Sequence, residues 1–447
     1  MWMTQRKKSI YQKILILFFF CLLVQYEHDI KYKDMCLNRS ENALRRRKKD
    51  RVRWDDVSSR MSKYQFRRMF RMSINCFEEL CQTIICSICE KKFKSQHYID
   101  AFLVEKSSIY EANCVTTAGY ISGEIKLAIT IRLLAGGDAL DLAVIFDIYP
   151  THILKIFQEV LSEWIIDPNL GQMDILKYLG DKDAMARVSN GFSKRSNGVL
   201  KGAIGAIDGW LVKIRRPNHY CDDITNAVPY FSRKGYYALN VQCIVDDRKK
   251  VLWAKFNNKG ASHDSTCFKH SELYETLYEI RDSLFHEQLF FIGDSAYGIE
   301  SFLIPPYDLA PSRSPQDDFN FFHSSARITV ECAFGEIDLR WGIFWKRLCF
   351  SVDMNMLICE GAMHLHNFLV SYRDDHNEDY AYEKMVYEND CYDNGYTSEV
   401  IGNDSLRMAG RPAVNAETSR IGGIYIRDKL NQSIQHHDMH RPRLADT

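Results

Sequence analysis

The hydrophobic pattern of the chain changes near Leu200, and this change limits the folds that the sequence can adopt. Upstream, apolar residues recur at steps of three and four, as from Phe66 to Leu80, which predicts one face of a helix or of two abutting helices. Downstream, short continuous apolar runs such as 203–207 predict buried strands. The 447 residues allow about two or three domains, so we expect a helical region followed by an α/β domain.

The helical region, residues 56–185, contains a helix–turn–helix outline. Residues 121–135 predict an apolar helix that ends at Gly136-Gly137. In residues 138–164 a short helix is broken at Asp147–Pro150 and followed by a second helix. This is the outline of a DNA-binding helix-turn-helix, but any pair of antiparallel helices shares it. Base contacts cannot be assigned from it.

Beyond residue 200, strands and helices are mixed. A hairpin is predicted around the polar turn Asp246–Lys250, and two apolar runs end close to an acid. The predicted elements are strands at 203–207, 237–245, 251–256 and 289–292, and helices at 264–282, 330–341 and 356–370.

Three acids stand in similar settings in this α/β part. Asp208 and Asp294 follow predicted strands, and Glu331 lies near the start of a predicted helix. Cleavage of a phosphodiester develops charge on an attacking and a leaving oxygen, which two carboxylate-bound divalent ions can stabilise. Each acid also has a structural alternative: a turn residue, a helix N-cap, and an ion pair with Arg327 four residues earlier. Their joint occurrence in one strand–hairpin–helix–strand–helix order favours a shared site.

The net charge of zero, from 58 basic and 58 acidic residues, conceals two charged segments. Residues 31–71 hold 15 basic and 5 acidic residues, a net of +10, whereas residues 373–404 hold 2 and 10, a net of −8. A neutral total therefore does not exclude a nucleic-acid partner. The cluster Arg45–Lys49 is typical of a nuclear-import signal, a phosphate-contacting arm or a solvated charge run.

The N-terminal residues 1–55 are interpreted as a basic flexible arm with a short apolar segment at 14–24. That segment has 11 residues, short of the roughly 20 that span a bilayer. It resembles a signal peptide but lacks a cleavage site with small residues. We therefore expect a nuclear protein, with membrane association or secretion as the alternative if the segment is a targeting signal. The sequence does not say whether residues 1–55 belong to the mature protein.

The 14 cysteines have no regular spacing, which excludes a disulfide scaffold. Cys86 and Cys89 form one CxxC pair with Cys81 nearby. A structural zinc site needs four ligands, so metal binding by these three is left open and reduced thiols are expected.

Several long strings in residues 200–370 resemble the PIF/Harbinger transposases and the nucleases derived from them, a family of DDE-type endonucleases. A weaker match covers the helical region. The matching strings are GAIDGWLVKIRRP, YFSRKGYYALNVQCIVD, GASHDSTCFK, FIGDSAYG, FNFFHSSARITVECAFGEIDLRWGIF and LHNF.

The resemblance implies a fold and a set of site residues. Residues 200–370 are expected to form an RNase H-like domain, a mixed sheet flanked by helices. Asp208 resembles the first metal-binding Asp of the family, Asp294 the second and Glu331 the third acid. Asp264 matches another position near the site, as a supporting acid or as the cap of the following helix. Nearby cations that could hold DNA phosphates are Lys213, Arg215, Arg216, Arg233 and Lys234.

By this resemblance the chain is expected to be a DNA endonuclease or transposase that uses two Mg²⁺ or Mn²⁺ ions and no small-molecule cofactor. DNA is the expected partner, and a separate Myb-like DNA-binding protein or a homo-oligomer is compatible with the family. Two alternatives stay open: a catalytically retired derivative that binds DNA or protein, and a related phosphodiesterase that acts on RNA. The acidic residues 373–447 are expected to be largely disordered.

Overall fold

The computed structural model describes five stretches of the chain, and all of the described residues except Ile121 belong to one compact unit. The apolar segment 14–24, the cluster Arg45–Lys49 and the predicted basic arm up to residue 51 lie outside these stretches. The end of the arm, predicted to run to residue 55, is wrong, because helix α2 (Trp54–Ser58) begins before that residue. The described residues are 52–90, 121–222, 224–376, 414–437 and 439–442.

An aromatic cluster organises the first helices. Trp54 stacks on Phe77 with ring centroids 4.7 Å apart, and Phe66 and Phe70 pack against both rings. The apolar steps predicted from Phe66 onward therefore fall on two abutting helices, α3 and α4. The first three helices are α2 (Trp54–Ser58), α3 (Lys63–Phe70) and α4 (Ile74–Glu90).

The predicted helix–turn–helix outline is present as α8 (Ala139–Ile145) and α9 (Pro150–Ile166), preceded by α7 (Gly123–Leu134). The side chain of Asp138 caps α8 by accepting from the backbone N–H of Leu140 at 2.7 Å, because the first amides of a helix lack partners within the helix. Helix α9 contacts α4, α7 and α8. DNA binding by this hairpin stays a prediction.

A five-stranded mixed sheet forms the centre of the α/β part, in the order β3-β2-β1-β4-β5. Strands β1, β2 and β3 pair antiparallel, whereas β4 and β5 continue from β1 in parallel. The predicted hairpin around residues 246–250 is confirmed as β2 and β3. The strands are β1 (Ala203–Lys213), β2 (Ala238–Val245), β3 (Val251–Lys259), β4 (Phe290–Ile292) and β5 (Leu303–Ile304).

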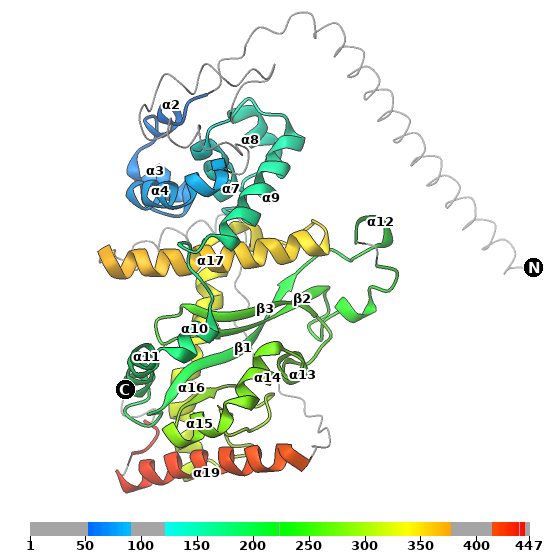
Figure 1. Cartoon of the computed structure of the whole chain (residues 1–447). Coiled ribbons are helices and arrows are strands. Elements are labelled where there is room, and N and C mark those ends of the chain that lie inside the picture. The colour runs from blue at the N-terminus through cyan, green and yellow to red at the C-terminus, as the bar shows by residue number, and fades with distance from the viewer. Residues whose placement is uncertain (1–51, 91–120, 223, 377–413, 438, 443–447) are drawn as a thin grey trace, which may run out of the picture. The chain divides into compact units, whose positions relative to one another are not determined.

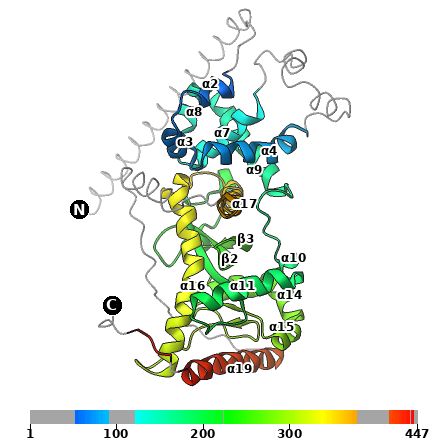
Figure 2. The same ribbon diagram turned by 90° about the vertical axis from the view of Figure 1, so that its left-hand side faces the viewer.

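Helices pack against this sheet, as expected for an RNase H-like fold (Figures 1 and 2). Helices α11 and α16 contact each other and β1, while α17 contacts β3 and α9. The further helices are α10 (Ile175–Gly180), α11 (Lys182–Arg195), α12 (His219–Asp222), α13 (Asp264–Lys269), α14 (Glu272–Glu279), α15 (Arg281–Glu287), α16 (Pro315–Arg340) and α17 (Val352–His376), with 3-10 turns at Val228–Tyr230 and Gly342–Trp345.

Two predicted settings differ from the structure. Asp208 lies within β1 rather than at its tip, because the strand continues to Lys213 along the antiparallel partner β2. Glu331 lies well inside α16 rather than near its start, because that helix begins at Pro315 and is capped by Ser314. Helix α16 is therefore long, with 26 residues, and packs against β1 and β2 of the sheet.

The expectation of disorder after residue 373 does not hold for residues 414–436, which form helix α19 (Val414–His436). Ile426 and Ile434 are buried, and α19 contacts α16 and β5. Ser419 Oγ accepts from the backbone N–H of Ser301 at 3.1 Å. The apolar periodicity of α19 is weak because few apolar residues of this helix are buried against α16 and β5. Residues 377–413 lie outside the described part of the chain.

No helix in the described residues is both long enough and apolar enough to cross a membrane.

Candidate active site

The register of two parallel strands brings the two predicted aspartates together. Ala206 on β1 pairs with Ile292 on β4, and each aspartate follows its paired residue by two positions. Neighbouring strands lie about 4.8 Å apart, so Asp208 and Asp294 are side by side where β4 has ended and β1 continues. A separation of 86 residues along the sequence is thus closed by one pair of strands.

Asp264 joins this pair from the other face of the sheet. Its Oδ1 accepts hydrogen bonds from Asn240 Nδ2 at 2.8 Å and from Gln242 Nε2 at 2.9 Å, both on β2. The Gln242 amide is fixed in turn, because its Oε1 accepts from the Tyr297 hydroxyl at 2.7 Å. Asp264 is therefore held rigidly by buried neutral donors, and it also begins helix α13.

The three aspartates form a single electrostatic cluster. Burial, followed by the charge of Asp294, raises the pKa of Asp208 to about 7, and Asp264 adds to this shift. Burial and then the charge of Asp264 raise the pKa of Asp294 as well. Carboxylates that oppose one another's ionisation in a buried site are a recognised mark of a functional site. A cation placed among them would relieve the repulsion.

Glu331 is linked to this cluster through Arg327. The Arg327 guanidinium donates from Nη1 to Asp208 Oδ2 at 3.2 Å and from Nη2 to Glu331 Oε1. Burial lowers the pKa of Arg327, but Asp208 and Glu331 outweigh it and raise that pKa. The predicted ion pair of Glu331 with Arg327 is confirmed, and Arg327 also contacts Asp208.

The donor set fits a hard divalent cation in its chemistry, since it consists of carboxylate oxygens. Among the described residues, however, no group of three His, Cys, Asp or Glu side chains is arranged to hold a metal ion. At this site the Arg327 guanidinium contacts both Asp208 and Glu331. The roles of Asp208, Asp294 and Glu331 as metal ligands remain predictions.

Some of the predicted phosphate-binding cations are exposed, and others contact neighbouring residues. Arg233 is exposed and near enough to Asp294 to lower its pKa. Arg215, by contrast, is engaged inside the protein, where it donates to the Phe350 carbonyl at 3.0 Å and pairs with Asp222. Lys213 lies over the Tyr236 ring at 5.0 Å. Arg216 and Lys234 are exposed.

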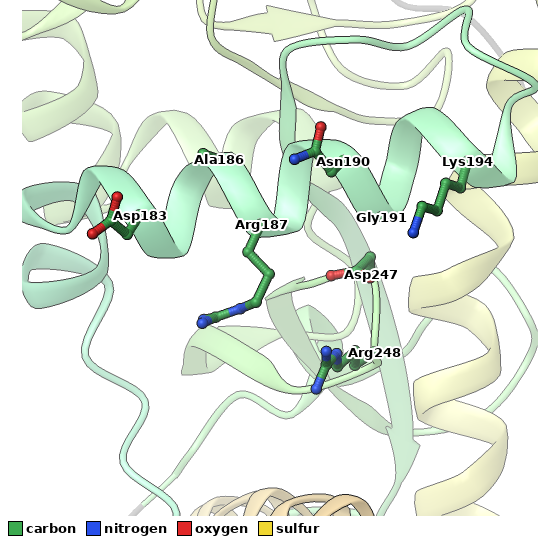
Figure 3. Close-up of a pocket in the computed structure, with 8 residues that line it drawn as sticks. All are labelled: Asp183, Ala186, Arg187, Asn190, Gly191, Lys194, Asp247 and Arg248. Atoms are coloured by element: carbon green, nitrogen blue, oxygen red, sulfur yellow. The ribbon is translucent and has the colours of Figure 1, made fainter.

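A pocket of about 500 Å³ lies between α11 and the turn that joins β2 to β3. In Figure 3, Lys194 extends from α11 toward Asp247, while Arg187 leaves the same helix and its end turns away from Asp247 and Arg248. Gly191 allows helix α11 and the Asp247 side chain to lie close together, because a Cβ at Gly191 would stand 1.9 Å from Asp247 Oδ2. None of the predicted catalytic acids lines the pocket, so it is a separate surface feature.

The cysteine prediction is tested in part. Cys81 is a buried free thiol, and burial, followed by the charge of Glu124, raises its pKa far above the usual range. A protonated, buried thiol is a poor metal ligand. The side chains of Cys86 and Cys89 lie outside the described residues.

Two groups of site residues were missed or undervalued in the sequence. Asn240 and Gln242 lie two positions apart in the otherwise apolar strand β2, and such alternation of polar residues in a buried strand marks one side of it as a polar site. The sequence predicts Arg327 only as an ion-pair partner for Glu331. Its contact with Asp208 depends on the packing of α16 against β1 and has no signal in local spacing.

Comparison with known proteins identifies a family that resembles part of this chain. Residues 207–367 match the family model described as DDE superfamily endonuclease. The chain is also 22% identical over 342 residues to "Protein ALP1-like" of Arabidopsis thaliana, covering 72% of this chain and 75% of that protein. No solved structure gives a significant match. The predicted resemblance to the DDE-type endonucleases is therefore confirmed, with residues 207–367 as the matching segment.

Proposed function

We propose that this protein is a metal-dependent endonuclease that cleaves phosphodiester bonds in DNA. The observation that carries the proposal is the cluster of Asp208, Asp294 and Asp264, in which burial and the neighbouring acids raise the pKa of Asp208 and of Asp294, inside a segment that matches the DDE superfamily endonucleases. Such a cluster is unfavourable by itself and is compensated when cations bind to it.

In this proposal Asp208, Asp294 and Glu331 hold Mg²⁺ or Mn²⁺, and Asp264 supports the site. The bound ions would activate a water molecule and stabilise the charge on the leaving oxygen. The Asn240 and Gln242 amides keep Asp264 in place. Arg233 and the other exposed cations hold the DNA backbone by contacts that do not depend on sequence.

The test is nicking of supercoiled DNA by the purified full chain with Mg²⁺ or Mn²⁺. Asp294→Asn keeps the shape of the side chain and removes its charge, so it should reduce nicking at least about a hundredfold, a loss of roughly 3 kcal/mol of transition-state stabilisation. Asp282→Asn is the matched control, because Asp282 lies on α15 with its side chain 80% exposed. Equal nicking by wild type and Asp294→Asn would exclude this mechanism.

A second function, binding without cutting, is supported by one observation. The Arg327 guanidinium already neutralises part of the charge of Asp208 and Glu331, as a permanent replacement for a metal ion would. Tight DNA binding by a wild-type protein that never nicks DNA would favour this retired derivative. Preferential cutting of RNA would favour the other alternative, an RNA phosphodiesterase.

We also propose a nuclear location, because DNA is the substrate and the segment 31–71 is strongly basic. A fluorescent fusion of the full chain should accumulate in the nucleus, and replacement of Arg45–Lys49 by alanines should release it. A Myb-like DNA-binding partner and a homo-oligomer remain part of the proposal. Sedimentation of the protein with and without DNA tests the oligomer.

A further inference from the structure

Arg327 is a buried cation placed among the acids of the proposed site. Its side chain is 7% exposed, and it contacts Asp208 through Nη1 and Glu331 through Nη2. These two carboxylates come from different elements, β1 and α16, so a single guanidinium joins the sheet to the helix. A planar, forked group with several donors is well suited to serve two carboxylates in this way.

The contact with Glu331 keeps that carboxylate against its own helix. Residues four positions apart on a helix face each other, and the pairing uses the Oε1 atom of Glu331. The acids that raise the pKa of Asp208 are Asp294 and Asp264. As described above, no three acids in the described part of the chain are arranged around a common metal position. In this arrangement Glu331 is therefore paired with Arg327 instead of joining the aspartates.

We propose that Arg327 is an internal counter-ion of the acid site, which a divalent cation must displace before Glu331 can join Asp208 and Asp294. The inference rests on the proposed function, since it concerns the same carboxylates. A guanidinium and a metal ion are both attracted to these oxygens and repel each other at short range. Arg327 is thus a positioning residue that acts through Asp208 and Glu331 and lowers the affinity of the site for metal.

Arginine suits this role better than a titratable cation. Its guanidinium stays charged at all physiological pH values, so it cannot leave the site by losing a proton. Displacement of Arg327 by a divalent cation therefore depends on the concentration of that cation and on the negative charge of the bound DNA phosphates. Before exchange, Arg327 offsets the mutual repulsion of the acids and keeps the metal-free site folded.

The experiment is a calorimetric titration of the metal-free full chain with Mn²⁺ alone. Arg327→Gln should bind Mn²⁺ at least about tenfold more tightly than wild type, because the competing charge is gone. Arg327→Lys should fall between them, since the ammonium keeps the charge but lacks the rigid planar fork of the guanidinium. Arg233→Gln is the matched control: it also removes a cation near Asp294, but that cation is exposed, and it should change the affinity by less than about threefold.

Two results would overturn the inference: Mn²⁺ binding by Arg327→Gln that equals or falls below that of wild type, or an equal gain in Arg233→Gln. The first would mean that Arg327 supports the metal site, and the second that any loss of positive charge suffices. If wild type binds Mn²⁺ through Asp294 but never nicks DNA, the proposed function fails and the counter-ion role is still tested. If no variant binds Mn²⁺, both proposals fail.

A structural measurement on the wild-type chain covers the case in which Arg327→Gln does not fold. Crystals grown with Mn²⁺ should show the Arg327 guanidinium withdrawn from Asp208 and Glu331, and Glu331 turned toward the ion. Mn²⁺ bound at Asp208 with both Arg327 contacts intact would contradict the exchange. This readout does not depend on nuclease activity.

Discussion

Gly209 on β1 lies directly against the Asp264 carboxylate: a Cβ at Gly209 would stand 2.2 Å from Asp264 Oδ1 and 2.7 Å from Gln242 Nε2. The residue after the first aspartate of the site must therefore be glycine for a steric reason. Asp208 and Gly209 are neighbours on one strand, so their positions face opposite sides of the sheet. The central strand β1 thus carries Asp208 on one face and leaves room at Gly209 for Asp264 on the other.

Gly209→Ala should displace Asp264 and lower DNA nicking at least about tenfold, because the fixed carboxylate has no room to stay. Gly335→Ala is the matched control, since an added Cβ on this exposed position of α16 meets nothing within 4 Å. It should leave nicking unchanged and stabilise the helix by roughly 0.5–1 kcal/mol. Nicking rates and urea unfolding of both variants check the prediction, which is wrong if Gly209→Ala nicks DNA as wild type does.

Helix α19 should contribute measurably to the stability of the α/β part. Ile434 is 1% exposed and Ile421 on the same helix is 63% exposed. Ile434→Ala should therefore lower the free energy of unfolding by about 2–4 kcal/mol, through lost burial and a new cavity. Ile421→Ala should change it by less than about 0.5 kcal/mol. Equal unfolding midpoints for the two variants would show that α19 is not docked in solution.

Acid should destabilise the fold through buried histidines. Burial lowers the pKa of His366 to about 4, despite the nearby charge of Glu336, and His366 Nε2 lies 2.8 Å from the Lys249 carbonyl. The unfolded chain takes up this proton near pH 6.5, whereas the folded chain does so only near pH 4. The unfolded state thus binds more protons in this window, and stability falls as the pH drops from about 6.5 to about 4.

His366 should make the free energy of unfolding fall by about 1.4 kcal/mol for each pH unit between about 6.5 and about 4, or by about 3 kcal/mol in total. His366→Gln should remove that part of the slope, and the exposed His152→Gln should not. Urea unfolding at several pH values between 7.5 and 4.5 measures the three slopes. Parallel curves for wild type and His366→Gln would contradict the assigned cause.

Arg233 and Arg215 should differ when each is replaced by glutamine. Arg233 is exposed near Asp294, so its loss should lower the slope of log K against log salt for DNA binding by about 0.9. Arg215 serves the interior, and its loss leaves Asp222, whose side chain is 1% exposed, without an ion-pair partner. Arg215→Gln should therefore destabilise the fold by about 1–3 kcal/mol. Binding measured at several salt concentrations, together with thermal unfolding, separates the two effects.

Local pattern predicted most of the elements of this protein. The hairpin of β2 and β3 was visible because apolar runs flank a polar turn, and the helix pair α8 and α9 because a break at 147–150 separates two periodic segments. Helix α19 was missed, since its few buried residues give almost no periodic signal. The span predicted as one helix from residue 264 is instead three short helices, α13 to α15.

The sequence by itself determined which side chains could take part in the chemistry. Each Asp or Glu beside an apolar run can be identified from its own local sequence. Their arrangement was decided by tertiary structure alone. The pairing of Ala206 with Ile292 aligns two aspartates, and the packing of α16 on β1 places Arg327 between Asp208 and Glu331. The Ala206–Ile292 pair and the Arg327–Asp208 contact join residues 86 and 119 positions apart. Such contacts depend on strand register and helix packing, and no local pattern encodes them.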